Sequence, residues 1–211
     1  MISLEAIQNS LAIANFDVLK AHQIMMPMMR SRQRPAELLG RPRIGAVLLL
    51  LYHHQNEFHV VLTKRREDLN SHAGQISFPG GSQENDESLQ NTALRETHEE
   101  IGVPQTAVTI LGQLSPLYIP PSDFEVHPFV GWVHTQQQPQ FIPQASEVAQ
   151  ILEVPLTHLF NPTTIEEELH DFRGQQIMVP FFNVEGHKVW GATAMMLSEF
   201  LQRIKTQRST S

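Results

Sequence analysis

The sequence predicts an α/β/α sandwich, in which helices cover both faces of a β-sheet. Short runs rich in Val, Leu and Phe are separated by polar turns, which is typical of strands. Apolar residues at helical spacing occur near both ends of the chain and in its middle. Because strands with helices on either side pack most simply in layers, we expect a layered α/β fold.

The first element is expected to be a helix over residues 3–20. Leu4, Ile7 and Leu11 recur there at helical spacing, and Ser3 can cap the start. Residues 46–53 and 58–64 are separated by a short polar turn and predict a hairpin. The remaining elements are expected as strands at 107–114, 125–133 and 151–154, helices at 156–160 and 163–170, a hairpin of strands at 177–182 and 187–190, and a helix at 192–205.

The length and composition indicate one sizeable core. The chain has 211 residues, a mass of 24.0 kDa and 41% hydrophobic residues. This length is somewhat greater than that of a minimal domain. We therefore expect a main domain over residues 41–211 that follows an N-terminal helical extension over residues 1–40.

Charge and cysteine content limit the partners. The net charge is −7, so no overall attraction to nucleic acid or an anionic membrane is expected. Residues 46–52 form the longest apolar run, far short of the about 20 residues that span a bilayer. The chain has no cysteine and starts without the pattern of a signal peptide. We expect a cytoplasmic protein that binds a small molecule; a homodimer is left open.

The most informative segment is Gly80–Val103, which reads GGSQENDESLQNTALRETHEEIGV. At about 100° per residue, Glu96, Glu99 and Glu100 share an arc of roughly 100° on one helix. Like charges at this spacing repel each other, so the arrangement favours a divalent cation among them. Carboxylate oxygens are ligands for Mg²⁺ or Mn²⁺.

The same helix carries its own ends and a core face. Asn85 or Asp86 can serve as N-cap. Gly102 is suited to the C-cap, and Pro104 then prevents the helix from continuing. Thr97 falls on the apolar stripe, so we expect it to face the core. The fork of Arg95 is expected to orient Glu87 or Glu99. The open alternative for the acidic residues is a solvated helix face.

Five residues separate Gly81 from Glu87, and seven residues separate Glu87 from the pair Arg95-Glu96. The pair Glu99-Glu100 and then Gly102 follow. This resembles the Nudix box, with Thr97 at a position that is usually aliphatic. The resemblance implies a Nudix-like α/β/α sandwich with a mixed β-sheet, and a Nudix hydrolase domain over residues 41–211. It also implies Mg²⁺ or Mn²⁺ as cofactor, held by Glu96, Glu99, Glu100 and the Gly80 carbonyl.

The residues before the box, VLTKRREDLNSHAGQISFPGG, resemble the signature of the coenzyme A pyrophosphatase branch of this family. The matching residues are Leu62, Thr63, Arg65, Gly74, Phe78, Pro79, Gly80 and Gly81. Arg66 stands where the signature has a small residue, and Asn70 replaces an arginine. The resemblance implies coenzyme A or acyl-CoA as substrate and 3′,5′-ADP and 4′-phosphopantetheine as products. Arg65, His72 and Gly74 are the expected substrate-binding residues.

A proton acceptor outside the metal ligands is chemically useful, and Glu147 is the best candidate. His127 and His134 are weaker candidates because histidines on strands are often surface or core residues. The expected catalytic set is thus Glu96, Glu99, Glu100, Arg95 and Glu147. Two alternatives stay open: another substrate such as ADP-ribose, a dinucleotide or a nucleoside triphosphate, and a non-catalytic ligand-sensing domain.

Overall fold

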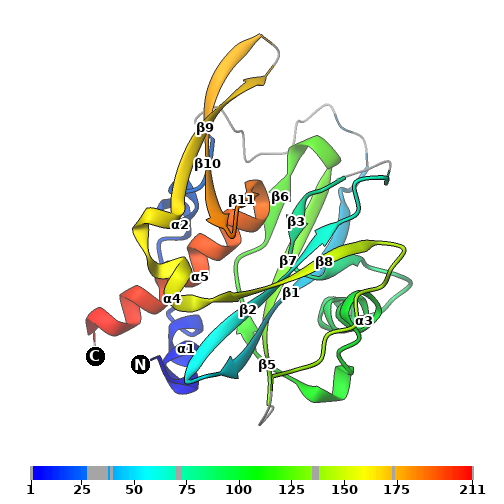
Figure 1. The fold of residues 1–211 in the computed structure, drawn as a ribbon, viewed down its shortest axis with the longest axis vertical. Helices are drawn as coiled ribbons and strands as arrows, with labels where there is room; N and C mark the ends of the chain where they lie inside the picture. The colour runs from blue at the N-terminus through cyan, green and yellow to red at the C-terminus, as the bar shows by residue number, and fades with distance from the viewer. Residues whose placement is uncertain are drawn as a thin grey trace.

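The computed structural model describes residues 2–27, 38, 40–69, 73–134, 138–172 and 174–210. Strand β1 (Arg43–His54) lies at the centre of a mixed sheet with the order β3-β2-β1-β7-β5 (Figure 1). It pairs antiparallel with β2 (Glu57–Arg65) and β4 (Gly80–Ser82), and parallel with β7 (Phe124–Val133). Strand β8 (Val148–Pro155) extends the sheet beyond β2.

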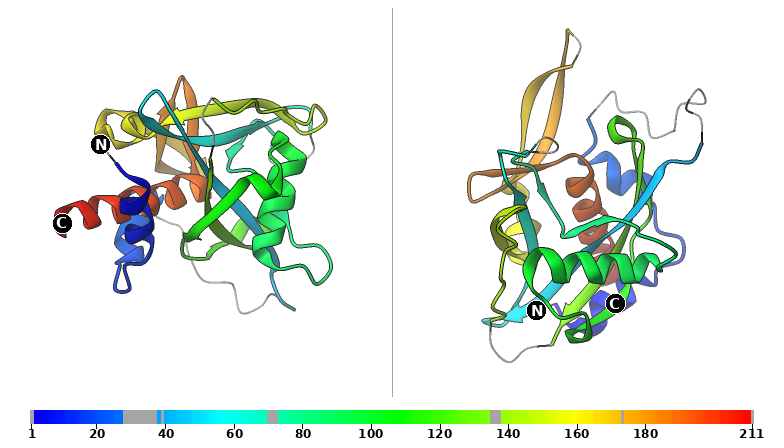
Figure 2. Two further views of the ribbon diagram at one scale, coloured as in Figure 1. Left: turned by 90° about the horizontal axis from the view of Figure 1, so that it is seen from below. Right: turned by 90° about the vertical axis from the view of Figure 1, so that its right-hand side faces the viewer.

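Helices cover both faces of this sheet, as predicted. Helix α3 (Leu89–Ile101) packs on one face. Helices α1 (Leu4–Leu11), α2 (Val18–Gln23) and α5 (Gly191–Thr210) lie on the other (Figures 1 and 2). Alternate residues of β1 enter the two cores: Leu48 and Leu50 face α3, while Leu49 and Leu51 join the larger core around α5. This alternation explains why residues 46–52 are continuously apolar, because both faces of the strand are buried.

Most predicted elements are confirmed, with small changes at their ends. The elements that complete the order are η1 (Gln105–Ala107), β5 (Val108–Gln113), α4 (Leu156–Phe160), β10 (Gln175–Val184), β11 (His187–Trp190) and α5 (Gly191–Thr210). The expectations did not include the short elements β3 (Ile76–Ser77), β4, η1, β6 (Leu117–Ile119), η2 (Pro120–Ser122) and η3 (Pro162–Thr164).

The single N-terminal helix expected over residues 3–20 was wrong. The structure has α1 (Leu4–Leu11), capped by Ser3, and α2 (Val18–Gln23). Asp17 caps the second helix by accepting a hydrogen bond from the Lys20 amide at 3.0 Å. The cap competes with helix continuation, since an aspartate side chain satisfies amides that a longer helix would pair.

The helix expected over residues 163–170 was also wrong, because residues 165–172 form strand β9 (Ile165–Phe172). It pairs antiparallel with β10, and β11 completes a second sheet of three strands. The glutamates of IEEELHDF favour a helix locally, but strand pairing across the turn at Gly174 decides the outcome. The β9–β10 hairpin projects as an arm at the top of Figure 1.

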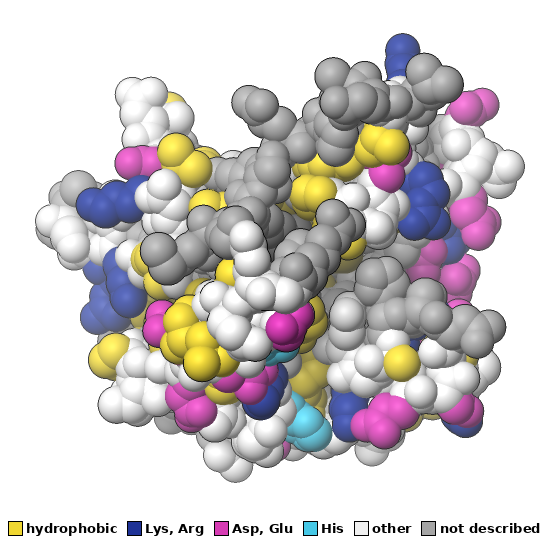
Figure 3. Space-filling model, turned by 90° about the horizontal axis from the view of Figure 1, so that it is seen from above, with side chains coloured by type: hydrophobic (Ala, Val, Ile, Leu, Met, Phe, Trp, Pro, Cys, Tyr) yellow, Lys and Arg dark blue, Asp and Glu magenta, His cyan; other side chains and the backbone are white. Residues whose placement is uncertain are grey.

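The face at the top of Figure 1 is shown from above in Figure 3, where hydrophobic side chains lie between acidic and basic ones. None of the helices in the described ranges is long and apolar enough to cross a membrane.

Candidate active site

The glycine turn before α3 is required by close backbone packing. Strand β4 runs beside the start of β1, with Gly80 opposite Val47. Gly80 has φ +153°, and a Cβ there would lie 2.4 Å from the Ala46 carbonyl oxygen. Only glycine fits this approach, which carries the chain from the sheet to the acidic helix.

The start of α3 differs from the prediction. Its N-cap is Ser88, which accepts a hydrogen bond from the Asn91 amide at 3.2 Å, rather than Asn85 or Asp86. Asn85 instead adopts a positive φ of 50° in the preceding turn. Glu87 closes this turn by accepting from the Glu84 amide at 3.1 Å, so the helix starts later. The predicted C-cap is confirmed, with Gly102 in the left-handed conformation.

The core face of α3 is confirmed, and it contains Thr97. The Thr97 side chain is fully buried, and its hydroxyl donates to the Ala93 carbonyl at 2.7 Å. This bond satisfies the only polar group that threonine adds to an otherwise apolar stripe, so its methyl group can pack as an aliphatic residue would.

Arg95 organises the carboxylates along the edge of the helix. Its guanidinium donates to Glu87 at 2.8 Å, Glu96 at 3.0 Å and Glu99 at 3.2 Å. It also donates to the Ser82 carbonyl in β4 at 3.1 Å. The hydrogen bond from Arg95 lowers the pKa of Glu87 to about 2. Arg95 therefore connects the turn to the helix and holds both Glu96 and Glu99.

Glu100 is the buried member of the acidic set. It is 8% exposed, and its Oε2 has no hydrogen-bond partner among the described residues. Burial and the nearby Glu96 carboxylate raise the pKa of Glu100 to about 8, although a backbone hydrogen bond from Gly80 opposes the shift. Burial also raises the pKa of Glu96, against the effect of Arg95.

These observations fit a divalent cation. A buried carboxylate oxygen without a partner is costly, and a hard cation is the group that would satisfy it beside Glu96. Within the described ranges, no three acidic or histidine side chains already converge as a metal site. The Glu99 side chain is 50% exposed and pairs with Arg95 at 3.2 Å.

Glu147 lies close to this cluster although it is distant in sequence. The loop before β8 is fixed to the end of α3, where the amides of Ile142 and Gln144 donate to the carbonyls of Ile101 and Glu100 at 3.0 and 2.8 Å. The Glu147 charge contributes to the raised pKa values of Glu96 and Glu100. The structure thus places Glu147 near enough to Glu96 and Glu100 for its charge to act on both.

Arg65 joins the same cluster from the end of β2. Its guanidinium donates to Glu147 Oε2 at 3.0 Å, and its charge lowers the pKa of Glu100 against the larger effect of burial. Gly74 forms the adjoining turn with φ +67°, and its amide donates a hydrogen bond to the Arg66 carbonyl at 3.4 Å. His72 and Asn70 lie outside the described residues.

The two histidines considered as bases have other contacts. His127 in β7 bonds to Glu125 at 2.9 Å, and the His134 ring packs edge-on to Trp132. The sequence expectations missed the loop amides of Ile142 and Gln144. A helix C-terminus leaves carbonyls that need donors, which was a signal that some segment docks there but not which one.

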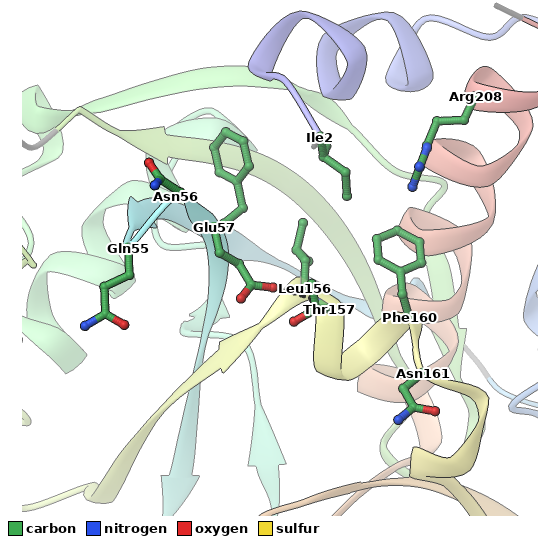
Figure 4. A pocket seen from close by; sticks show the side chains of 10 residues that line it. Ile2, Gln55, Asn56, Glu57, Leu156, Thr157, Phe160, Asn161 and Arg208 are labelled. Carbon is green, nitrogen blue, oxygen red and sulfur yellow. Dashed lines mark hydrogen bonds between the residues drawn. The ribbon is translucent and has the colours of Figure 1, made fainter.

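A cavity of about 490 Å³ lies elsewhere, between the β1–β2 turn, α4 and the end of α5. Figure 4 shows Ile2, Leu156, Phe160 and Arg208 at its border. The β1–β2 turn is about 23 Å along β1 from Val47, at about 3.3 Å per residue. The cavity is therefore separate from the carboxylate cluster.

The α/β/α sandwich carries a glycine turn, an acidic helix ordered by Arg95, and a buried Glu100 oxygen without a partner among the described residues. This arrangement is suited to hydrolysis assisted by a divalent ion. The chain matches the NUDIX domain family over residues 42–174 and belongs to the Nudix hydrolase family. Nudix hydrolases generally use divalent ions such as Mg²⁺ or Mn²⁺.

Two bacterial relatives are similar over most of their length, and both are described as uncharacterized Nudix hydrolase NudL. The protein of Photorhabdus laumondii is 36% identical over 172 residues, covering 81% of this chain and 90% of its own. That of Pectobacterium atrosepticum is 34% identical over 194 residues, covering 92% and 96%.

A solved structure supports the fold. The Nudix hydrolase RenU of M. smegmatis superposes with a TM-score of 0.53 at 15% identity, covering 82% of this chain and 89% of that one. At this identity the likeness concerns the fold alone.

Proposed function

We propose that this Nudix hydrolase cleaves the pyrophosphate of coenzyme A or its acyl derivatives, giving 3′,5′-ADP and 4′-phosphopantetheine. The observation that carries the proposal is the position of the coenzyme A-type signature. Its residue Arg65, at the end of β2, is 3.0 Å from Glu147 beside the acidic helix. A substrate diphosphate at the carboxylates would therefore lie next to the loop that the signature defines.

Glu96, Glu99, Glu100 and the Gly80 carbonyl would hold Mg²⁺ or Mn²⁺. A bound divalent cation supplies charge that offsets the diphosphate and lowers the pKa of the attacking water. The protein contributes by positioning these carboxylate and carbonyl oxygens. Arg95 restrains Glu96 and Glu99 through hydrogen bonds of 3.0 and 3.2 Å.

Glu147 is proposed as the proton acceptor. Its Oε2 is paired with Arg65, so Oε1 is the atom that would take the proton from water. Replacing it by glutamine keeps the shape and removes the basicity, so Glu147→Gln should lower kcat by about 10²- to 10⁴-fold. Full recovery with excess Mg²⁺ would instead make Glu147 a metal ligand.

The test is a substrate panel with the full chain and saturating Mg²⁺ or Mn²⁺. Coenzyme A, acetyl-CoA, ADP-ribose, a dinucleoside polyphosphate and a nucleoside triphosphate are compared by kcat/KM, and products are identified by mass. The highest kcat/KM on coenzyme A or acetyl-CoA, with 3′,5′-ADP as product, is expected. A higher value on ADP-ribose would move the substrate elsewhere within the family. Binding without turnover of any compound would favour a ligand-sensing domain.

A further inference from the structure

The end of β2 holds the loop that carries Glu147 at three points. The Arg65 side chain donates to the Glu147 carboxylate at 3.0 Å. The Arg66 amide donates to the Glu147 carbonyl at 2.9 Å. The Arg66 side chain donates through Nη1 to the Ala145 carbonyl at 2.7 Å. Two adjacent arginines thus bind both the backbone and the side chain of one short loop.

Arg66 has a second set of contacts that fixes its fork. Its Nε and Nη2 donate to the two oxygens of Asp68 at 2.8 and 2.6 Å. This bidentate pair occupies the side of the guanidinium that would otherwise match a phosphate. The signature has an arginine at position 70, where this chain has asparagine. Arg66 stands in the same segment but is poorly suited to take over the role of that arginine.

The loop is fixed on its other side by α3, through the amides of Ile142 and Gln144. Glu147 is consequently held between α3 and the end of β2. We propose that Arg65 and Arg66 are positioning residues for the reaction. Arg65 orients the Glu147 carboxylate, and Arg66 holds the backbone that carries it. The proposal rests on the role of Glu147 in the proposed function and replaces the expected contact of Arg65 with substrate.

The physical reason is the precision that proton transfer needs. An acceptor must lie within hydrogen-bond reach of the water, and a displacement of about 1 Å can cost about 10²-fold in rate. The side chains of Arg65 and Glu147 are 32% and 43% exposed, so their ion pair adds little to stability. Its main effect is to select one orientation of a carboxylate that would otherwise rotate.

A double-mutant cycle tests Arg65. Arg65→Ala, Glu147→Gln and the double variant are compared on coenzyme A and on 3′-dephospho-coenzyme A. Arg65→Ala alone should lower kcat by about 10- to 100-fold on both substrates, with a smaller change in KM. In the Glu147→Gln background the same change should cost less than about twofold, because Arg65 acts through Glu147. Arg65→Lys, which keeps one donor, should recover part of kcat.

Losses that multiply in the double variant would overturn the role of Arg65. A loss on coenzyme A alone would also overturn it and would assign Arg65 to the 3′-phosphate. If the substrate panel identifies a different substrate, the cycle is run on that substrate. The coupling between Arg65 and Glu147 does not depend on which diphosphate is cleaved, so the two proposals fail separately.

Arg66 is tested by Arg66→Ser, which restores a small residue at this signature position. We expect faster hydrogen exchange in the peptide over residues 142–150, a loss of about 3- to 10-fold in kcat and a shifted pH profile. Lys64→Ala is the matched control, because Lys64 lies on the same strand end but pairs with Glu67 at 3.0 Å. The control should leave exchange in that peptide unchanged. Unchanged exchange in Arg66→Ser would overturn the role of Arg66, whatever the substrate.

Discussion

The carboxylate of Glu96 lies directly against the α-carbon of Gly81. A Cβ at position 81 would be 2.5 Å from the carboxylate carbon of Glu96, much closer than real contacts allow. The glycine of the turn thus provides the space in which a proposed metal ligand sits. The atoms in conflict belong to the end of a flexible side chain, which can move away without disturbing the backbone.

Gly81→Ala should therefore separate activity from stability. We expect kcat/KM to fall by about 10²-fold or more because Glu96 is displaced from its neighbours. The free energy of unfolding should change by less than about 1 kcal/mol, since no backbone atom has to shift. Steady-state kinetics and urea unfolding measure the two quantities. Ser82→Ala is the matched control and should alter neither, because Ser82 contacts Arg95 through its carbonyl.

Glu100→Gln is expected to abolish turnover and leave the fold intact. Glutamine keeps the volume of the buried side chain but removes the charge that a divalent cation needs. We expect a loss of about 10²-fold or more in kcat, with an unchanged far-UV circular dichroism spectrum. Near-normal kcat of the folded variant at saturating Mg²⁺ would remove Glu100 from the site.

The raised pKa of Glu100 predicts that metal binding releases a proton. With a pKa of about 8, the carboxyl group is mostly protonated at pH 7 in the metal-free protein. A cation needs the ionised form, so affinity for Mn²⁺ should rise from pH 6 to pH 8 and level off above. Calorimetry in two buffers with different ionisation enthalpies measures the released proton at pH 7. Glu100→Gln should lose this release, and equal heats in both buffers for the wild type would contradict the prediction.

The same pKa affects stability. The folded pKa of Glu100 lies above the ordinary value of 4.5, so the folded state binds more protons between these limits. The stability of the metal-free protein should consequently decrease as pH rises from about 5 to 8. Urea unfolding of wild type and Glu100→Gln over this range measures the effect, which should be smaller in the variant.

A buried cluster of charged side chains around Glu199 is expected to affect stability and not catalysis. Glu199 in α5 is fully buried and bonds to His22 of α2 at 2.9 Å and to Arg203 at 2.9 Å. It also accepts from Ser115. Glu199→Ala leaves Arg203 without its buried partner, and we expect a loss of about 3 to 5 kcal/mol in the free energy of unfolding. The kcat of the remaining folded enzyme should be unchanged, which active-site titration and kinetics determine.

The acidic helix and its glycine turn were largely predictable because their signals are local. The spacing of Glu96, Glu99 and Glu100 determines that they share one edge of a helix, and Gly102 determines where the helix ends. The core position of Thr97 follows from the same geometry. Each of these features depends on residues within one or two helical turns.

The start of α3 and the helix expected over residues 163–170 were wrong for different reasons, one local and one tertiary. Ser88, rather than Asn85 or Asp86, caps α3 because Glu87 and Arg95 close the turn before it. Residues 165–172 form a strand because β10 provides partners that no local propensity shows. For the strand, a contact between separate segments outweighed a local preference of about 1 kcal/mol or less per residue.

The sequence by itself determined the family-type motif, the carboxylates and the layered fold class, since these depend on composition and on spacing along one element. Only the tertiary structure decided that the charge of Glu147 acts on Glu100 and that Arg65 is bonded to Glu147. Residues 65 and 147 are 82 positions apart, and they meet through the pairing of β2 with β8 and the docking of a loop on α3. The physical reason is that helix periodicity is a property of neighbouring residues, whereas strand order and loop docking are properties of the whole packed chain.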